Sequence, residues 1–519
     1  MYMYHLVLLF AVTAVHITSA QIKYTEYMRQ REELLKKEQR RRIGGTLVLN
    51  DDEQKVNRIL MHEKRKEYED SRLHGKLFPP AISFFKSKPM IDESNVFKLI
   101  RRMPKGGVLH LHDSAMFNLT WLITNFTYSP HCYMCYDDNN RLIFRFLPDD
   151  HDNKRCQWIK VNELRQTAWD NDAFDKMLVN NITLITPTPD TTYPTLNDVW
   201  RKFGAYFGIV GGLLHHAPVR KAVLQETLRQ FLADNVQYIE FRSSFSELYE
   251  LDGSRRSRSW FIEMYRDVIN QFTREHPDFI GAKVINAVFR RQSRDTILST
   301  IKTAIGYRKT YGNFFAGFDI VGQEGRGKTL LHFIDEFLYA RQQVPPLDLP
   351  YVFHAGETDW GETQVDDNLI DAILLNTTRI GHGYALHKHP EVLNIVYDRD
   401  IGIVVSPISN QVLKLVKDLR NHPAAALISS NYPIVISSDD PATWDATPLS
   451  HDFYMAFMGL AGEDADLTFL KQLAMNSIKY SAMTKTEKKA AYGIWQSSWN
   501  RFILDVLQND WPHYIPIIG

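Results

Sequence analysis

The sequence has no excess of charge of either sign, few cysteines and no apolar stretch of comfortable membrane-spanning length. Lys and Arg number 61 among the 519 residues, and Asp and Glu also number 61. Without a net charge the protein has no long-range field that would attract nucleic acid or an anionic membrane surface. We therefore expect no nucleic-acid partner. The apolar segment 6–15 is too short to span a membrane, so we also expect no membrane span.

The first twenty residues have the pattern of a secretion signal. The apolar segment 6–15 precedes the small residues Thr18, Ser19 and Ala20, which suit signal-peptidase cleavage, although the start carries only His5 and no Lys or Arg. We predict a signal peptide over residues 1–20; a buried helix is the alternative. Four Asn-X-Thr sequons for glycosylation follow, at Asn118, Asn125, Asn181 and Asn376. Together these features predict a secreted, extracellular glycoprotein.

The odd number of cysteines leaves one thiol without a partner in an oxidising compartment. The three are Cys132, Cys135 and Cys156. We expect a disulfide from Cys156 to either Cys135 or Cys132. A structural zinc site made by these cysteines with His131 is an alternative, although the spacing is not that of a standard zinc finger.

Residues 21–102 are expected to form charged helices. Segment 29–42 is a dense run of both charges, which usually marks a solvated helix face. The apolar positions are too few for a separate core and need a surface from the main domain or from a second subunit; they are Ile59, Leu60, Val96, Phe97 and Ile100. We predict that this region holds a homodimer together.

The rest of the chain alternates short apolar runs with helix-length segments. Eight strands are predicted, at residues 108–112, 236–242, 283–289, 317–321, 351–354, 379–383, 401–406 and 433–438. Repeated strand–helix units indicate parallel strands, and eight of them predict an α/β fold of the (β/α)8 TIM-barrel type. An open doubly wound sheet is the alternative. We assign residues 103–127 and 187–508 to the barrel and the loop-rich segment 128–186 to an insertion.

Polar residues stand where several of these strands end, which is where barrel enzymes carry their functional groups. His110 and His112 alternate along one strand and therefore point to the same side. With His354 and Asp439 they make an N,N,N,O set that suits one Zn²⁺ per chain. Such an ion lowers the pKa of a coordinated water to about 7. The spacing thus predicts metal-assisted hydrolysis.

Three further residues fit the needs of such a reaction. His382 can act on the water proton, and Glu357, held protonated near the apolar strands, can supply a proton to the substrate. In the deamination of a purine, Glu357 would protonate ring nitrogen N1 while Asp440 accepts a hydrogen bond at N7.

Five segments carry a specific resemblance to a known family. MPKGGVLHLHDSAM, FHAGETDW, TTRIGHGYAL, SPISNQVLKLVKDLRNHP and VISSDDPA resemble the adenosine deaminase-related growth factors, also called the secreted adenosine deaminase 2 group. The resemblance covers nearly the whole chain. It implies a zinc-dependent deaminase of adenosine, and also of 2′-deoxyadenosine, that could act as a growth factor by depleting extracellular adenosine.

The resemblance also implies individual roles. Carried over by motif, His110, His112, His354 and Asp439 bind zinc, and Glu357 and His382 are catalytic. The implied substrate contacts are Asp113, Trp200, Phe203, Phe207, Gly322 and Asp440. It further implies a disulfide between Cys135 and Cys156, with Cys132 free, and a dimer formed by the N-terminal helices.

The sequence departs from the family pattern at two places. Arg290 or Arg291 stands where vertebrate relatives carry His, and Gly322-Gln323-Glu324 replaces the usual Gly-His-Glu. The first difference affects the expected contact to the ribose.

Two other functions are considered. Residues 322–329, GQEGRGKT, match the phosphate-loop pattern after a strand, which would indicate a nucleotide-binding protein. That hypothesis leaves the His and Asp residues on four other strands unexplained. Alternatively, the barrel could be vestigial, with the basic 29–42 helix contacting a cell-surface receptor or a glycosaminoglycan. All the metal and acid–base positions are filled, however, which favours an enzyme.

Overall fold

The computed structural model describes residues 24–150, 156–168, 170–342 and 349–508, so the predicted signal peptide lies outside the described residues. Eight parallel strands form its centre: β1 (Gly107–Val108), β5 (Tyr238–Ser243), β8 (Gly281–Phe289), β9 (Phe315–Val321), β10 (His354–Ala355), β11 (Arg379–His382), β12 (Gly402–Val405) and β13 (Ile434–Ile436). They pair as β1-β5-β8-β9 and β10-β11-β12-β13. Single parallel bridges from Phe318 to Tyr351 and from Leu111 to Asp439 join the two sheets on both sides. The strands therefore close into a barrel, as predicted.

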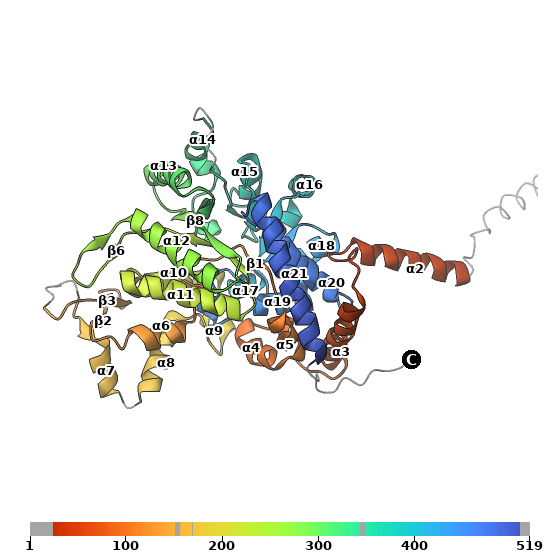
Figure 1. The fold of residues 1–519 in the computed structure, drawn as a ribbon, viewed down its shortest axis with the longest axis horizontal. Coiled ribbons are helices and arrows are strands. Elements are labelled where there is room, and N and C mark those ends of the chain that lie inside the picture. The colour runs from red at the N-terminus through yellow and green to blue at the C-terminus, as the bar shows by residue number, and fades with distance from the viewer. Residues whose placement is uncertain (1–23, 151–155, 169, 343–348, 509–519) are drawn as a thin grey trace, which may run out of the picture.

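Helices cover the outside of this barrel (Figure 1). They are α11 (Ala217–Ala233), α12 (Arg258–Glu275), α13 (Arg294–Tyr311), α14 (Ile334–Gln342), α15 (Asn368–Leu374), α16 (Pro390–Asp398), α17 (Pro407–Val412), α18 (Ala424–Ser429), α19 (Ser450–Met455), α20 (Leu467–Lys479) and α21 (Lys485–Gln508). Each of the longer ones buries an apolar face; α12, for example, buries Phe261, Tyr265, Val268 and Phe272. Among the described residues, no helix is both long and apolar enough to cross a membrane.

Segment 128–186 adds a small antiparallel sheet, in the order β3-β2-β4, and two helices. Its elements are β2 (Cys132–Tyr136), β3 (Leu142–Phe146), β4 (Ile159–Lys160), α7 (Val161–Thr167) and α8 (Asn171–Ile182). The sheet packs against α10 (Leu196–Leu214), and α8 packs on α6 (Leu119–Phe126). One hydrophobic cluster runs from the sheet into α6, α10 and α11. The insertion is thus built onto the barrel rather than folded around a separate core.

A disulfide joins Cys135 to Cys156, and Cys132 is a buried free thiol. The pairing implied by the family resemblance is confirmed, and the alternative zinc site made by these cysteines is excluded.

We predict that Cys135→Ser lowers the yield and stability of the protein more than Cys132→Ala. The disulfide spans 21 residues, and closing a loop of that size stabilises the folded state by roughly 3 kcal/mol in the chain-entropy model. Cys132→Ala removes only a small buried group. Denaturant unfolding of the two variants, oxidised and reduced, measures the difference. Equal free energies of unfolding for the two variants would show that the disulfide stabilises the protein no more than one buried thiol does.

The N-terminal helices α3 (Asp51–Leu73), α4 (Phe84–Glu93) and α5 (Asn95–Arg102) pack on the barrel's own C-terminal helices. Lys64 donates hydrogen bonds to the carbonyls of Gly462 and Ala465 at 2.8 and 2.7 Å, and the Trp499 indole donates to Glu53 at 2.7 Å. Of the two surfaces that were predicted to cover the apolar side chains of this region, the structure shows the main domain, and all five are buried within one chain: Ile59, Leu60, Val96, Phe97 and Ile100. That reason for a dimer is therefore wrong, because α19, α20 and α21 supply the covering surface.

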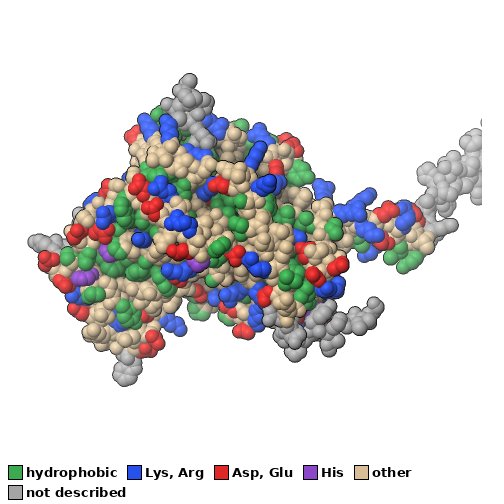
Figure 2. Space-filling view, in the orientation of Figure 1, with side chains coloured by type: hydrophobic (Ala, Val, Ile, Leu, Met, Phe, Trp, Pro, Cys, Tyr) green, Lys and Arg blue, Asp and Glu red, His purple; other side chains and the backbone are tan. Residues whose placement is uncertain are grey.

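Helix α2 (Tyr24–Arg41) differs from the other N-terminal helices because it buries no residue. It projects from the body of the protein (Figure 1), with hydrophobic side chains among its charged ones (Figure 2).

Candidate metal centre and substrate pocket

Imidazoles and a carboxylate meet at the carboxyl ends of the barrel strands. His110, His354, His382 and Asp439 bring one ligand atom each within 4.8 Å of one another. His112 joins them through Asp439, whose carboxylate lies 3.2 Å from its Nε2 atom. The structure thus brings together all four predicted metal ligands and the predicted catalytic histidine.

Local backbone geometry aims two of these side chains into the barrel. His382 and Asp439 both have positive φ, 62° and 60°, in the left-handed region that residues other than glycine rarely adopt. Such strain persists only where the surroundings enforce it, and it clusters at functional sites. Here it turns each strand end so that the side chain faces the cluster.

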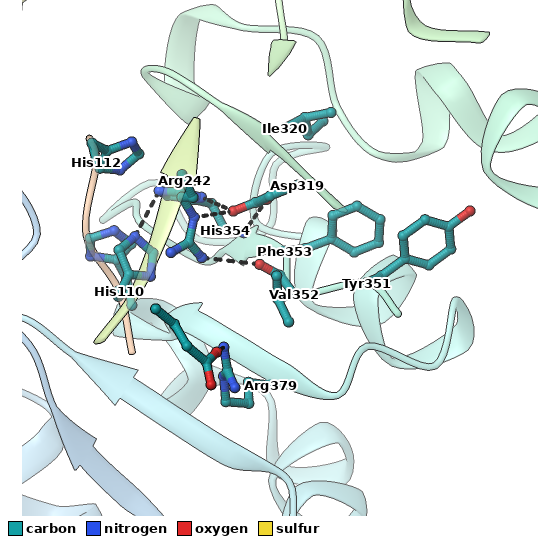
Figure 3. A network of polar contacts seen from close by, with 12 residues as sticks. His110, His112, Arg242, Asp319, Ile320, Tyr351, Val352, Phe353, His354 and Arg379 are labelled. Carbon is teal, nitrogen blue, oxygen red and sulfur yellow. Dashed lines mark hydrogen bonds and ion pairs between the residues drawn. The ribbon is translucent and has the colours of Figure 1, made fainter. Parts of the chain in front are cut away.

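Asp319 and Arg242 form a hydrogen-bonded group with His354 (Figure 3). The Nδ1 atom of His354 donates to the Asp319 carboxylate at 2.6 Å, and Arg242 donates to the same carboxylate at 2.6 Å. This leaves the Nε2 lone pair of His354 free to face the cluster, as in the carboxylate–histidine pairs that support metal ligands.

The segment SPISNQVLKLVKDLRNHP supports the other side of the cluster. Ser409 donates to Asp439 at 2.8 Å, and Asn410 lies 3.3 Å from Nδ1 of His382. His422 in turn lies 3.0 Å from the Asn410 side-chain oxygen. These contacts give a physical reason for a motif that has no metal-binding residue of its own.

The donor set fits a divalent metal such as zinc. Burial lowers the pKa of His354 to about 4 and that of His382 to about 3, so both imidazoles are neutral and offer lone pairs at pH 7. Burial alone would raise the pKa of Asp439, but the hydrogen bond from His112 and the neighbouring imidazoles hold it below its usual range. The Nε2 atoms of His110 and His354 are 2.9 Å apart, close enough for both neutral nitrogens to bind one metal ion.

Burial favours the protonated form of two carboxyls beside the cluster. Burial, together with the charges of Asp439 and Glu324, raises the pKa of Glu357 well above its usual range. Burial and the charge of Asp439 do the same for Asp440. Glu357 lies 3.6 Å from Nδ1 of His382. The site therefore favours the neutral form of two carboxyls next to one carboxylate, that of Asp439, whose pKa is held low.

The cluster opens into a cavity of about 440 Å³, a volume suited to a small organic molecule. All the predicted substrate contacts line it: Asp113, Trp200, Phe203, Phe207, Gly322 and Asp440. The three aromatic residues lie along α10, with the Phe203 ring 5.3 Å from Trp200 and 5.0 Å from Phe207. Asp113 lies 3.4 Å from Arg220 and accepts a hydrogen bond from Tyr265.

Sequence reasoning missed the residues that support the cluster. Asp319 and Arg242 are charged residues inside otherwise apolar strands, and that is the signal that could have revealed them, because an unpaired charge is rarely buried. Ser409, Asn410 and His422 lie in the segment SPISNQVLKLVKDLRNHP, which the family resemblance singled out, but their residue types alone did not indicate a role at the cluster.

The segment that matches the phosphate-loop pattern does not form such a loop. After Thr329 the chain continues through a 3-10 turn, Leu331–Phe333, and α14 begins only at Ile334. Lys328 donates to the carbonyl of Gln292 at 2.9 Å. Without a helix N-terminus directly after the loop, the phosphate-binding hypothesis loses its physical basis.

A parallel barrel with a histidine–carboxylate cluster and protonated carboxyls at its strand ends defines the class of metal-dependent barrel hydrolases. The family model for adenosine deaminase matches residues 181–493, and the model for the adenosine/AMP deaminase N-terminal region matches residues 6–100. The chain belongs to the adenosine deaminase family.

Its relatives include proteins from vertebrates and insects. The chain is 44% identical to adenosine deaminase 2 of Pongo abelii over 92% of this chain and 93% of the relative. It is 42% identical to adenosine deaminase of Aedes albopictus over 92% of this chain and 88% of the relative. Among solved structures, the N6-methyl-AMP deaminase from Arabidopsis thaliana superposes with a TM-score of 0.53 at 17% identity, covering 78% of this chain and 99% of that one. This last likeness shows a shared fold.

Proposed function

We propose that this protein hydrolyses adenosine, and 2′-deoxyadenosine, to inosine or 2′-deoxyinosine and ammonia. The observation that carries the proposal is the buried Glu357 carboxyl, protonated and adjacent to His382 in the cavity of the metal cluster. Replacing the C6 amino group by water requires a proton at ring nitrogen N1 and a base for the water, and this pair supplies both. The names of the relatives agree with the substrate.

His110, His112, His354 and Asp439 would hold the metal, which we take to be one zinc per chain. When bound, zinc supplies the Lewis acidity that activates water at neutral pH. The neutral imidazole of His382 takes the proton that the attacking water loses, and Glu357 gives its own proton to N1. The imidazolium then gives its proton to the C6 amino group, which leaves as ammonia, and Glu357 regains a proton from the new C6 hydroxyl as it becomes the carbonyl of inosine.

Asp440 plays a different part from the one predicted from sequence. Purine N7 carries a lone pair and no hydrogen, so it can only accept a hydrogen bond. Because burial raises the pKa of Asp440, its carboxyl keeps a proton and donates it in a hydrogen bond to N7. We propose that Gly322 approaches the purine, that Asp113 contacts the ribose, and that Trp200, Phe203 and Phe207 form an apolar wall.

An ultraviolet time course with purified protein tests the activity. We expect adenosine and 2′-deoxyadenosine to be converted with release of one ammonia each. An intact, zinc-loaded protein that converts neither nucleoside would refute the proposal and would favour the receptor-binding role.

Secretion is part of the proposal. The Cys135–Cys156 disulfide suits an oxidising compartment. The sequon asparagines Asn118, Asn125 and Asn376 are exposed, and Asn181 is half-buried. We propose that cleavage after residue 20 releases a glycoprotein whose consumption of extracellular adenosine could itself act as a growth signal.

We further propose a homodimer in which α2 contacts a second copy of the chain. Its exposed apolar side chains recur along one face of the helix: Tyr24, Tyr27, Met28, Leu34 and Leu35. A projecting helix with such a stripe requires a partner to cover it.

We predict that changing both Leu34 and Leu35 to Ser shifts the protein toward monomer in sedimentation at micromolar concentration. Changing Lys36 and Arg40 to Ser on the opposite face should leave the assembly unchanged. A wild-type protein that sediments as a monomer would rule out the dimer, and a dimer that survives the Leu changes would place the interface elsewhere.

A further inference from the structure

We propose that Arg290 is a positioning residue for Glu357 and that it acts through the carboxylate of Glu324. The inference rests on the proposed role of Glu357 as proton donor. It also gives a structural reason for the glycine-rich segment GQEGRGKT, which matches the phosphate-loop pattern but does not form a phosphate-binding loop.

Arg290 is a buried cation with incomplete hydrogen bonding. It follows β8, is one of the residues that line the substrate cavity, and is 1% exposed. Its Nη2 atom lies 3.4 and 3.5 Å from the carbonyls of Ile320 and His354. Its Nε and Nη1 atoms have no hydrogen-bond partner among the described residues. A guanidinium with so few hydrogen bonds is buried at a cost, unless a charge nearby stabilises it.

Glu324 supplies that charge: burial raises the pKa of its carboxyl, and the Arg290 guanidinium opposes this rise by stabilising the ionised form. The Glu324 carboxylate lies 3.5 Å from Nη2 of Arg290, and both side chains are almost fully buried. The same carboxylate accepts a hydrogen bond from the backbone N–H of Glu357 at 2.6 Å and one from the side chain of Asn368 at 3.0 Å. Arg290 therefore stabilises the charge that anchors the Glu357 backbone.

The anchor matters because of where Glu357 lies in the chain. It follows Gly356, whose φ of 75° turns the chain sharply after β10. A carboxyl on such a turn has its position fixed by the hydrogen bonds of its own backbone. A misplacement of about 1 Å in a reacting group can lower a rate by roughly 10²-fold.

Gly327 leaves room for the Arg290 side chain. A Cβ atom at this position would lie 2.1 Å from Cδ and 2.5 Å from Cγ of Arg290, whereas a Cβ at Gly325 would meet nothing within 4 Å. The second glycine of the phosphate-loop pattern is thus explained by close packing against an arginine.

The first experiment compares Arg290→Met, Arg290→Lys and the control Arg326→Met, which changes an exposed arginine in the same loop. We expect Arg290→Met to lower kcat for adenosine by about 10- to 100-fold, with KM within a factor of about three and zinc content unchanged. Arg290→Lys should recover part of the loss, and Arg326→Met should match the wild type. A rise in KM with kcat unchanged would show direct substrate binding and would overturn the inference.

A double-mutant cycle that combines Arg290→Met with Glu324→Gln tests whether Arg290 acts on Glu357 through Glu324. If Arg290 acts through Glu324, the double variant should lose no more kcat than the worse single variant, because both changes break one link. Multiplicative losses would refute the inference. Unfolding midpoints of all variants identify any loss that comes from stability alone.

Gly327→Ala displaces the Arg290 side chain without changing its charge. This variant tests the role of Arg290 even if Arg290→Met does not fold. We expect Gly327→Ala to lower kcat while Gly325→Ala does not; equal kcat in these two variants would contradict the inference. Near-normal turnover by Glu357→Gln would instead refute the proposed role of Glu357. These two failures are therefore distinguishable.

Discussion

Replacing Glu357 by glutamine should lower kcat for adenosine by about 10²–10⁴-fold, the loss typical of a removed acid–base group. Glutamine has nearly the size of glutamate and keeps its backbone N–H, so the hydrogen bond to Glu324 remains. It has no proton to transfer to N1. Because the Glu357 carboxyl already holds a proton in the folded protein, an uncharged amide in its place should change the free energy of unfolding little.

The control for this variant is Glu362→Gln, an exposed position in the same loop. It should leave kcat unchanged. Zinc content and circular dichroism of both variants show whether the metal centre and the fold are intact. If Glu357→Gln retains zinc and turns over at a rate close to that of the wild type, the proton must come from another group.

Removing the metal should abolish turnover, with a loss greater than about 10³-fold, since the pKa of water falls from about 15.7 to about 7 on zinc. Activity should return on adding zinc to the apoprotein. The metal should also stabilise the fold, by about 4 kcal/mol when its free concentration is a thousand times its Kd. Metal analysis, activity and thermal unfolding before and after chelation measure all three effects.

Matched variants separate metal ligands from their neighbours. Asp439→Ala should lose zinc, whereas Asp440→Ala should retain it and lose affinity for the purine, because alanine has no group that can donate a hydrogen bond to N7. His112→Ala should lose zinc, whereas His382→Ala should retain it and lose turnover. The last comparison matters because His382 lies as close to the cluster as the proposed ligands do. Loss of zinc from His382→Ala but not from His112→Ala would exchange their roles.

The predicted interface of Ile59, Leu60 and Phe97 shows where reasoning from an apolar pattern failed. The pattern showed that these side chains must be covered. It could not show that α19, α20 and α21 of the same chain cover them, because that depends on where the chain returns after the last barrel strand. Helix α2, by contrast, keeps its apolar face exposed.

The sequence by itself determined the order of the eight strands and the positions of the ligand-bearing residues. Both are local properties: a strand is a short apolar run between turns, and a functional residue is the polar one at its end. That positions as distant as 110, 354 and 439 meet followed from the predicted barrel, but the tertiary structure alone decided the distances between their ligand atoms, because barrel closure sets those distances. It also decided which carboxyls keep their protons and which buried charges, such as Arg290 and Glu324, stabilise one another, because burial and pairing depend on neighbours that are remote in the sequence.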